Sequence, residues 1–285
     1  MRKILLATTA LVAMSVTAAH ADLSISGAYQ FEYKQVGSSG SNSATSDGNI
    51  TFKGTSAADN GITYSVVANN GIHNGTPEDV YLQIDGDFGT IYMGKGDNSL
   101  DRTDGALGLN ADVDSNGQPD ATKTTVSTAN GSESVNFISP SMSGFSVNGT
   151  VNEADGKSGI GINYKNDMIE VMYQSVGGGG TDAQSFGAKF SVAGFGVSMG
   201  SKETKKDGQK STASDLAVSY SFDGIKLVAL TANGKPGDGS AKSSYKSVGV
   251  SYSVAPGVTL GLENADIDSA GSKSAQTWAG LTVAF

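Results

Sequence analysis

Residues 23–33 run Leu-Ser-Ile-Ser-Gly-Ala-Tyr-Gln-Phe-Glu-Tyr, with apolar or aromatic residues at odd positions and mostly Ser, Gln and Glu between them. Successive side chains of a β-strand point to opposite faces, so this alternation predicts one face in lipid and the other in water. Alternation over about ten residues is the sequence pattern of a strand that crosses a bilayer. We therefore predict a membrane-spanning strand here.

The same alternation recurs to the last residue of the chain. Together with the first stretch and a strand around Ile91, it predicts 16 strands, an even number that suits a closed antiparallel barrel. The other segments contain Ile50 and Phe52; Ile62 to Ala68; Val80 to Ile84; Val135 and Phe137; Phe145 to Val151; Ile160 to Tyr164; Ile169 to Tyr173; Phe186 to Phe190; Phe195 to Met199; Leu216 to Phe222; Ile225 to Ala229; Val248 to Tyr252; Val258 to Leu262; and Leu281 to Phe285.

The connections between these segments alternate in predicted length. Short links such as Asp223-Gly224 alternate with Gly/Ser/Asx-rich segments such as Val36 to Gly48, Val176 to Asp182 and Glu203 to Thr212. Short periplasmic turns and longer outer loops are typical of bacterial barrels. We expect one all-β barrel domain over residues 22–285.

The first 21 residues fit a cleaved secretory signal peptide. Two basic residues precede an apolar run from Ile4 to Val16 and the small-residue site Ala19-His20-Ala21. A membrane anchor is the alternative, but the run is shorter than the roughly 20 residues that a spanning helix needs.

The charge balance excludes nucleic-acid binding. Without Arg2 and Lys3, the 19 basic residues fall to 17 while the 28 acidic residues remain. Nucleic-acid binding depends on Lys and Arg neutralising phosphates. The chain has no cysteine, so a disulfide framework is impossible.

The long segment from Lys95 to Glu133 shows no sustained alternation. Segments of this length without regular structure are usually functional or disordered. A 16-stranded barrel encloses an aqueous lumen, so we predict an inward-folded third loop that constricts it. A loop on the outer surface is the alternative.

Several motifs resemble those of one family. Residues 80–95 (VYLQIDGDFGTIYMGK), residues 134–145 (SVNFISPSMSGF), Phe52-Lys53-Gly54 and the terminal WAGLTVAF at 278–285 resemble, in this order, motifs of Gram-negative general diffusion porins, nearest to the alphaproteobacterial type. The resemblance implies an outer-membrane homotrimer of 16-stranded barrels, in contact with outer-membrane lipids. It also implies passive diffusion of small polar solutes and ions. A substrate-specific outer-membrane channel and a secreted β-rich adhesin are the alternatives.

Porins of this family set basic wall residues against acids on the loop. Lys95 stands at the matching basic position, Lys53 is predicted to face the lumen, and Arg102 is the one arginine after the signal peptide. We predict that these bases line the constriction with Asp97, Asp101 and Asp104, and that the surplus of acids makes the pore weakly cation-selective. If Lys95 faces the lumen as a strand residue, Tyr92 faces outward, unless a bulge at Gly94 changes the alternation.

Residues 112–120 resemble the first part of a calcium loop. Oxygen-bearing side chains stand at Asp112, Asp114 and Asn116, a glycine follows at the sixth position, and Gln118 and Asp120 supply later ligands. The bidentate Glu is missing because position twelve is Lys123. We predict a calcium site here, with a solvated Asx-rich turn as the alternative.

The sequence predicts no enzyme activity and no required cofactor. Hydrolysis needs a nucleophile beside a base such as His. Only His73 remains after the signal peptide, in the Gly/Asn-rich segment around Gly71 and Gly75, where a solvated turn residue is expected.

Overall fold

The computed structural model describes residues 21–37, 42–72, 77–108, 118–128, 133–154 and 156–285, so the predicted signal peptide lies almost wholly outside the described residues. The described chain forms sixteen strands and two short 3₁₀ helices. The elements are β1 (Ala21–Val36), β2 (Asn42–Ala57), β3 (Thr63–Gly71), β4 (Pro77–Gly86), β5 (Gly89–Lys95), η1 (Asp101–Thr103), η3 (Asp120–Thr122), β6 (Glu133–Ile138), β7 (Phe145–Asn152), β8 (Lys157–Lys165), β9 (Ile169–Gly178), β10 (Thr181–Val192), β11 (Phe195–Lys206), β12 (Gln209–Phe222), β13 (Ile225–Lys235), β14 (Ser243–Ala255), β15 (Val258–Ser269) and β16 (Ser272–Ala284).

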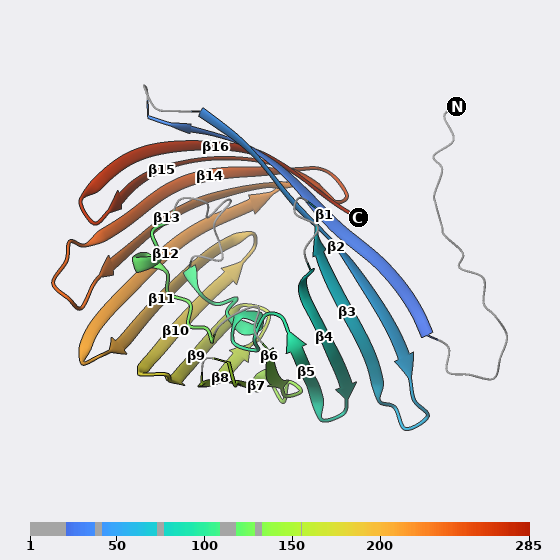
Figure 1. Ribbon diagram of the computed structural model, residues 1–285. Coiled ribbons are helices and arrows are strands. Elements are labelled where there is room, and N and C mark those ends of the chain that lie inside the picture. Colours follow the sequence, from blue (N-terminus) through green and yellow to red (C-terminus); the bar gives the residue numbers. More distant parts are fainter. Residues whose placement is uncertain (1–20, 38–41, 73–76, 109–117, 129–132, 155) are drawn as a thin grey trace, which may run out of the picture.

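The strands form one closed antiparallel barrel in which every strand pairs with its sequence neighbours and β1 pairs with β16 (Figure 1). At the closure Tyr29 stands opposite Val283, and Gly27 and Phe285 exchange two backbone hydrogen bonds of 3.0 Å each. Closure leaves the sheet without an edge, so each strand finds a backbone partner on both sides. The predicted fold class and number of strands are confirmed.

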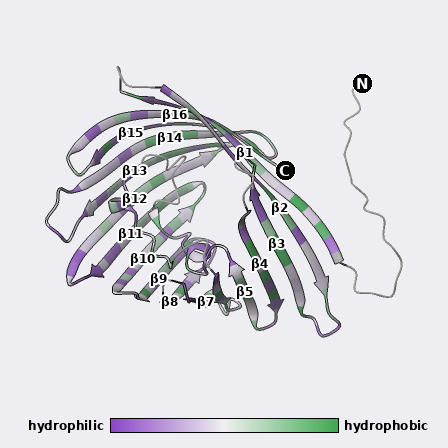
Figure 2. Cartoon of the chain, viewed as in Figure 1, coloured by the Kyte–Doolittle hydropathy of each residue, from purple (hydrophilic) through white to green (hydrophobic). Residues whose placement is uncertain are grey.

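The two faces of the barrel differ in chemistry. The outer face carries large apolar side chains that are one-third or more exposed, among them the aromatic residues Tyr29, Phe31, Tyr33, Tyr64, Tyr220, Phe222 and Phe285. The inner face carries buried polar side chains such as Asn136, Asn148 and Gln174. Hydropathy accordingly changes from residue to residue along the strands (Figure 2). This is the arrangement expected of a barrel with lipid outside and water inside.

Several outer connections are shorter than the sequence predicts. Strands β9 and β10 continue through the predicted loop Val176 to Asp182 and leave only Gly179-Gly180 between them. Strands β11 and β12 likewise meet at Asp207-Gly208. Both residues of this second turn have positive φ, 51° and 77°, as tight hairpin turns between twisted strands require. The Gly- and Asx-rich composition therefore marks hairpin turns here, and the strands extend into the flanking polar residues.

The longest connection lies between β5 and β6, from Gly96 to Ser132, as the sequence predicts. Its described parts pass through the lumen (Figure 1) and pack against the inner wall. Among the described residues, no helix is long and apolar enough to cross a membrane.

Two neighbouring residues of β2 test the assignment of the faces. Phe52 is 40% exposed on the outer face, whereas Thr51 lies on the inner face in register with Ser26 and Asn69. We expect Phe52→Lys to lower the free energy of unfolding by about 2–4 kcal/mol, because it sets a charge in the hydrocarbon region. Thr51→Lys should cost less than about 1 kcal/mol, since water reaches the inner face. Denaturant unfolding in lipid vesicles measures both; equal losses would contradict the assignment.

Candidate pore constriction

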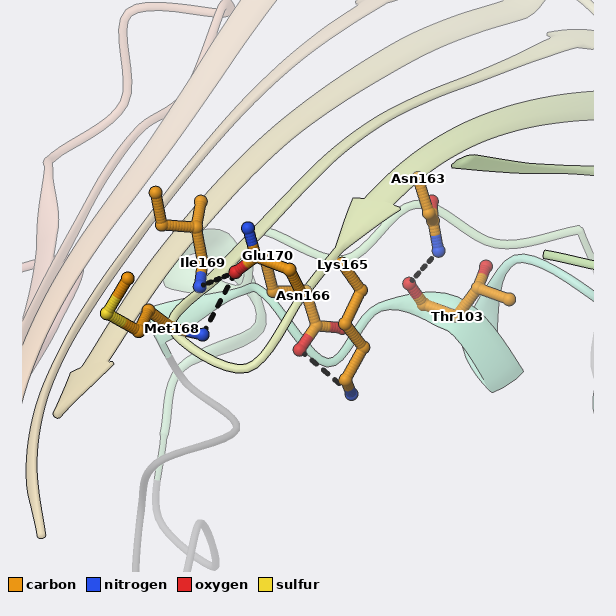
Figure 3. A network of polar contacts seen from close by, with 7 residues as sticks. All are labelled: Thr103, Asn163, Lys165, Asn166, Met168, Ile169 and Glu170. Carbon is orange, nitrogen blue, oxygen red and sulfur yellow. Dashed lines mark hydrogen bonds and ion pairs between the residues drawn. The ribbon is translucent and has the colours of Figure 1, made fainter. Parts of the chain in front are cut away.

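The first part of the long loop is fastened to the wall by side-chain amides. Gln174 on β9 donates from Nε2 to the Leu100 carbonyl at 2.7 Å. Asn163 on β8 donates to the Thr103 carbonyl at 2.9 Å, as Figure 3 shows. Asn148 on β7 donates to the Thr103 hydroxyl at 2.9 Å. Amides on the inner face thus tie the loop to three strands, and the bond to the Leu100 carbonyl adds to those from the Thr103 N–H and hydroxyl.

Apolar side chains of the loop are buried against the same wall. Leu100 is fully buried with Val126 and Val176, and Leu107 is fully buried beside Met172. Glycines on the wall make room for them: a Cβ at Gly159 would lie 2.6 Å from Leu100 Cδ1. One side of the loop is therefore packed against the wall, and the opposite side faces the lumen.

The second described part of the loop, residues 118–128, is fastened to strands further around the barrel. The Thr124 hydroxyl donates to the buried Asp215 carboxylate on β12, and the Ser185 hydroxyl on β10 donates to the Thr124 carbonyl at 2.7 Å. A Cβ at Gly234 on β13 would lie 2.0 Å from the Ala121 carbonyl oxygen. Close approach of loop backbone and wall thus requires glycine at this position.

Arg102 lies over two tyrosine rings of the wall. Its guanidinium carbon is 5.0 Å from the Tyr81 ring centre on β4 and 4.4 Å from the Tyr92 ring centre on β5. Its Nε donates to the Asp97 carbonyl at 3.1 Å. Cation–π contact on two rings restricts the side chain while the guanidinium stays exposed. The arrangement places one fixed positive charge beside the start of the loop.

The predicted acids lie close to this arginine in the chain but differ in surroundings. Asp97 is exposed, whereas Asp101 accepts hydrogen bonds from Asn98 Nδ2 at 2.9 Å and from the Ser127 hydroxyl at 3.1 Å. Asp104 is half-buried just after η1. A further acid, Glu170 on β9, pairs with Lys165 at 3.2 Å (Figure 3) and would lie 3.2 Å from a Cβ at Gly105.

The strand register separates the two predicted lysines. Lys53 stands opposite Ser24 and Val67, on the inner face. Lys95 stands opposite Val80, which is exposed on the outer face, and no register shift occurs around Gly94.

The prediction of a lumen-facing Lys95 is therefore not supported by the register. Tyr92 faces the lumen instead, where its ring contacts Tyr81 edge-on at 5.8 Å between centres. Gly94 has φ 130°, but the register with β4 and with β6 is continuous through it. Side chains therefore keep alternating between the two faces, and Lys95 lies at an outward position of β5.

Only two of the five predicted calcium ligands lie in the described chain. Gln118 is buried and donates to the Thr122 hydroxyl at 3.1 Å, and Asp120 pairs with Lys123 at 2.7 Å. The hydrogen bond from Lys123 lowers the pKa of Asp120. Asp112, Asp114 and Asn116 lie outside the described residues. Within the described residues no group of three or more His, Cys, Asp or Glu side chains could hold a metal ion. His73 also lies outside them.

Sequence reasoning missed the wall residues that position the loop. Tyr81, Asn148, Asn163 and Gln174 all occupy inward positions of strands that it predicted correctly. The available signal was chemical: long amides and a tyrosine stand at inward positions where Ser, Thr or Gly would suffice for a wetted wall. Which loop residue each one meets depends on the folded path of the loop.

The model of the Gram-negative porin family matches residues 7–285. The chain belongs to the Gram-negative porin family. Porins are channel proteins of the outer membrane, and this chain is accordingly an outer-membrane β-barrel. No curated protein matches the chain in sequence.

Solved porin structures share the fold at low identity. A mutant porin of Rh. blastica has a TM-score of 0.74 at 16% identity and covers 93% of this porin and 100% of its own chain. A loop-deletion variant of OmpT from Vibrio cholerae has a TM-score of 0.74 at 12% identity, over 93% and 99%. An anion-selective porin from Comamonas acidovorans has a TM-score of 0.72 at 14% identity, over 93% and 100%. These likenesses concern the fold.

Removing one amide should loosen the loop of this porin. Gln174→Met keeps the length of the side chain but leaves the Leu100 carbonyl without its 2.7 Å donor. We expect a loss of about 0.5–1.5 kcal/mol in unfolding free energy, because one buried hydrogen bond is lost while the Leu100 carbonyl keeps its bonds from the Thr103 N–H and hydroxyl. Protease cleavage within residues 96–108 should become faster. Gln184→Met, at an exposed position of β10, is the matched control; equal cleavage in the two variants would contradict the role of Gln174.

Calcium binding is tested by titration calorimetry. Clustered carboxylates repel one another until a cation neutralises them, so we expect heat of binding in the wild type and none in Asp112→Ala/Asp114→Ala. Asp238→Ala/Asp266→Ala removes the same charge from exposed positions elsewhere and should bind as the wild type does. Identical titrations of the wild type and the first variant would show that the site does not exist.

Proposed function

We propose that this porin forms a water-filled channel for passive diffusion of small hydrophilic solutes and ions, with weak selectivity for cations. The observation that carries the proposal is the fastening of the long loop across the inner wall from β7 to β13, through Asn148, Gln174, Thr124 and Gly234. A loop held in this way narrows the lumen without filling it, because only one of its sides packs against the wall.

The charges at the start of the loop support weak cation selectivity. We propose that Asp97, Asp101 and Asp104 border the lumen; Asp97 is exposed and Asp104 is partly exposed, and Arg102 is the one base within residues 96–108. Carboxylates around a narrow pore attract cations and repel anions. The effect should be modest, because Lys53 on the inner face of β2 adds a positive charge and because salt screens charges over roughly 10 Å at 0.1 M.

We further propose that the barrel assembles as a homotrimer in the outer membrane. The resemblance to general porins supports this assembly. A substrate-specific channel is the second candidate, and an observation on the wall that favours a solute-binding step is developed below.

Selectivity is measured as the reversal potential across a bilayer under a potassium chloride gradient. We expect a cation preference in the wild type that fades as salt rises and falls in Asp97→Asn/Asp101→Asn/Asp104→Asn. Arg102→Gln should strengthen it, because the acids then stand without their nearest base.

The matched control is Asp207→Asn/Asp238→Asn/Asp266→Asn, which removes three exposed carboxylates far from the loop in sequence and should leave the potential unchanged. Anion preference in the wild type, or an equal shift in both triple variants, would contradict the proposed role of the loop acids.

A further inference from the structure

The inner wall has a hollow between β15 and β16. Gly261 and Gly280 stand opposite each other in the register, so no side chain covers the wall at this point. The next inward-facing pair along the two strands is Glu263 and Trp278 in one direction and Thr259 and Thr282 in the other. A cavity of about 60 Å³ occupies this place, lined also by Gln30 and Ser251 from the neighbouring strands.

A buried hydrogen-bond donor borders the hollow. Trp278 is 1% exposed, and its indole Nε1 has no hydrogen-bond partner among the described residues. Buried donors in folded proteins are nearly always paired, with protein groups or with a bound molecule. Trp278 lines the cavity on one side and packs with Tyr245 and Ala265 on the other, so the cavity is the open space beside the ring from which we infer that an acceptor oxygen bonds the indole.

The other polar groups around the hollow are mostly acceptors or hydroxyls. Glu263 is 1% exposed, and its Oε1 accepts the Tyr245 hydroxyl at 2.6 Å, which fixes the carboxylate. Thr259, Thr282 and Ser251 add hydroxyls that donate or accept. The lining therefore presents one indole N–H, the amide of Gln30, one oriented carboxylate and several hydroxyls within one small volume.

This set of groups suits adjacent hydroxyl groups. The oxygen of a hydroxyl accepts from the indole N–H while its hydrogen is donated to a carboxylate or to a wall oxygen. An anion would be repelled by Glu263, an apolar molecule would leave the indole unpaired, and a simple cation offers the indole no acceptor. The volume is several times the roughly 10–15 Å³ that one water requires, so a molecule larger than water fits.

We propose that this hollow binds a small polyol of about the size of glycerol, as a solute-binding step on the diffusion path. The step rests on the proposed function in one respect, since solutes reach the hollow through the open lumen. Binding itself is measured on the folded protein in detergent and needs no ion current, so the two proposals can fail separately.

Trp278 is the one tryptophan of the chain, and its fluorescence reports on the hollow directly. We expect titration with glycerol to change its emission along a saturable curve, and titration with propan-1-ol or ammonium chloride to give no saturable change. Gly280→Val fills the hollow, since a Cβ at this position has nothing nearer than 3.6 Å, and it should weaken the glycerol response at least tenfold. Glu263→Gln should also weaken it, because the carboxylate acceptor is lost.

Gly54→Val is the matched control. Gly54 has open space around it and stands opposite Leu23 and Val66, both exposed on the outer face, so the variant should respond as the wild type does. Heat-modified migration on a gel verifies folding, and if Gly280→Val does not fold, Glu263→Gln carries the comparison. A linear glycerol response, a propan-1-ol response equal to that of glycerol, or unweakened responses in the folded variants would overturn the proposal. Normal ion conductance alongside such a result would leave the channel function standing.

Discussion

The structure depends on one constraint: inside a bilayer, each backbone N–H and C=O must find its partner within the protein. A chain with 39 glycines and no long apolar run meets this constraint with strands, and strands meet it fully only when the last pairs with the first. The pairing of β1 with β16, sealed by the hydrogen bonds between Gly27 and Phe285, is that closure. Sixteen strands in a closed ring enclose more space than their own inward side chains can fill. The lumen, the loop inside it and the hollow in its wall all follow from the size of the ring.

The backbone of the long loop also needs hydrogen-bond partners, but less strictly, because it lies between the wall and the water of the lumen. Two of its carbonyls accept from amides on successive strands, that of Thr103 from Asn163 and that of Leu100 from Gln174, and Asn148 donates to the Thr103 hydroxyl. Small wall residues such as Gly159 and Gly234 let it approach closely. Stiff attachment matters for function, since a loop that moved in and out of the lumen would give a pore of variable width.

The sequence predicted the parts of this structure that depend on local alternation, and missed those that depend on contact between distant segments. All sixteen strands, the loop boundaries at Lys95 and Glu133, and the inner position of Lys53 follow from period-two patterns. The outer hairpins were predicted as loops because Gly179-Gly180 and Asp207-Gly208 are equally typical of loops and of tight turns. The placement of Arg102 on Tyr81 and Tyr92 could not be predicted, since nothing in the pattern tells which strands the loop crosses. The outward parity of Lys95 depended on whether Gly94 forms a bulge, which a single sequence does not decide.

The central claim is that the start of the long loop borders the path of the ions. The chain has no cysteine, so Asp97→Cys carries one reactive thiol at an exposed loop position, and Asp238→Cys carries one in the turn between β13 and β14. The most direct measurement is the single-channel current of each variant in a planar bilayer while a bulky thiol reagent is added. The account predicts stepwise current that falls when Cys is at position 97 and stays constant when it is at position 238. Current that is unaffected by full labelling at position 97, or an absence of channels from folded protein, would contradict it.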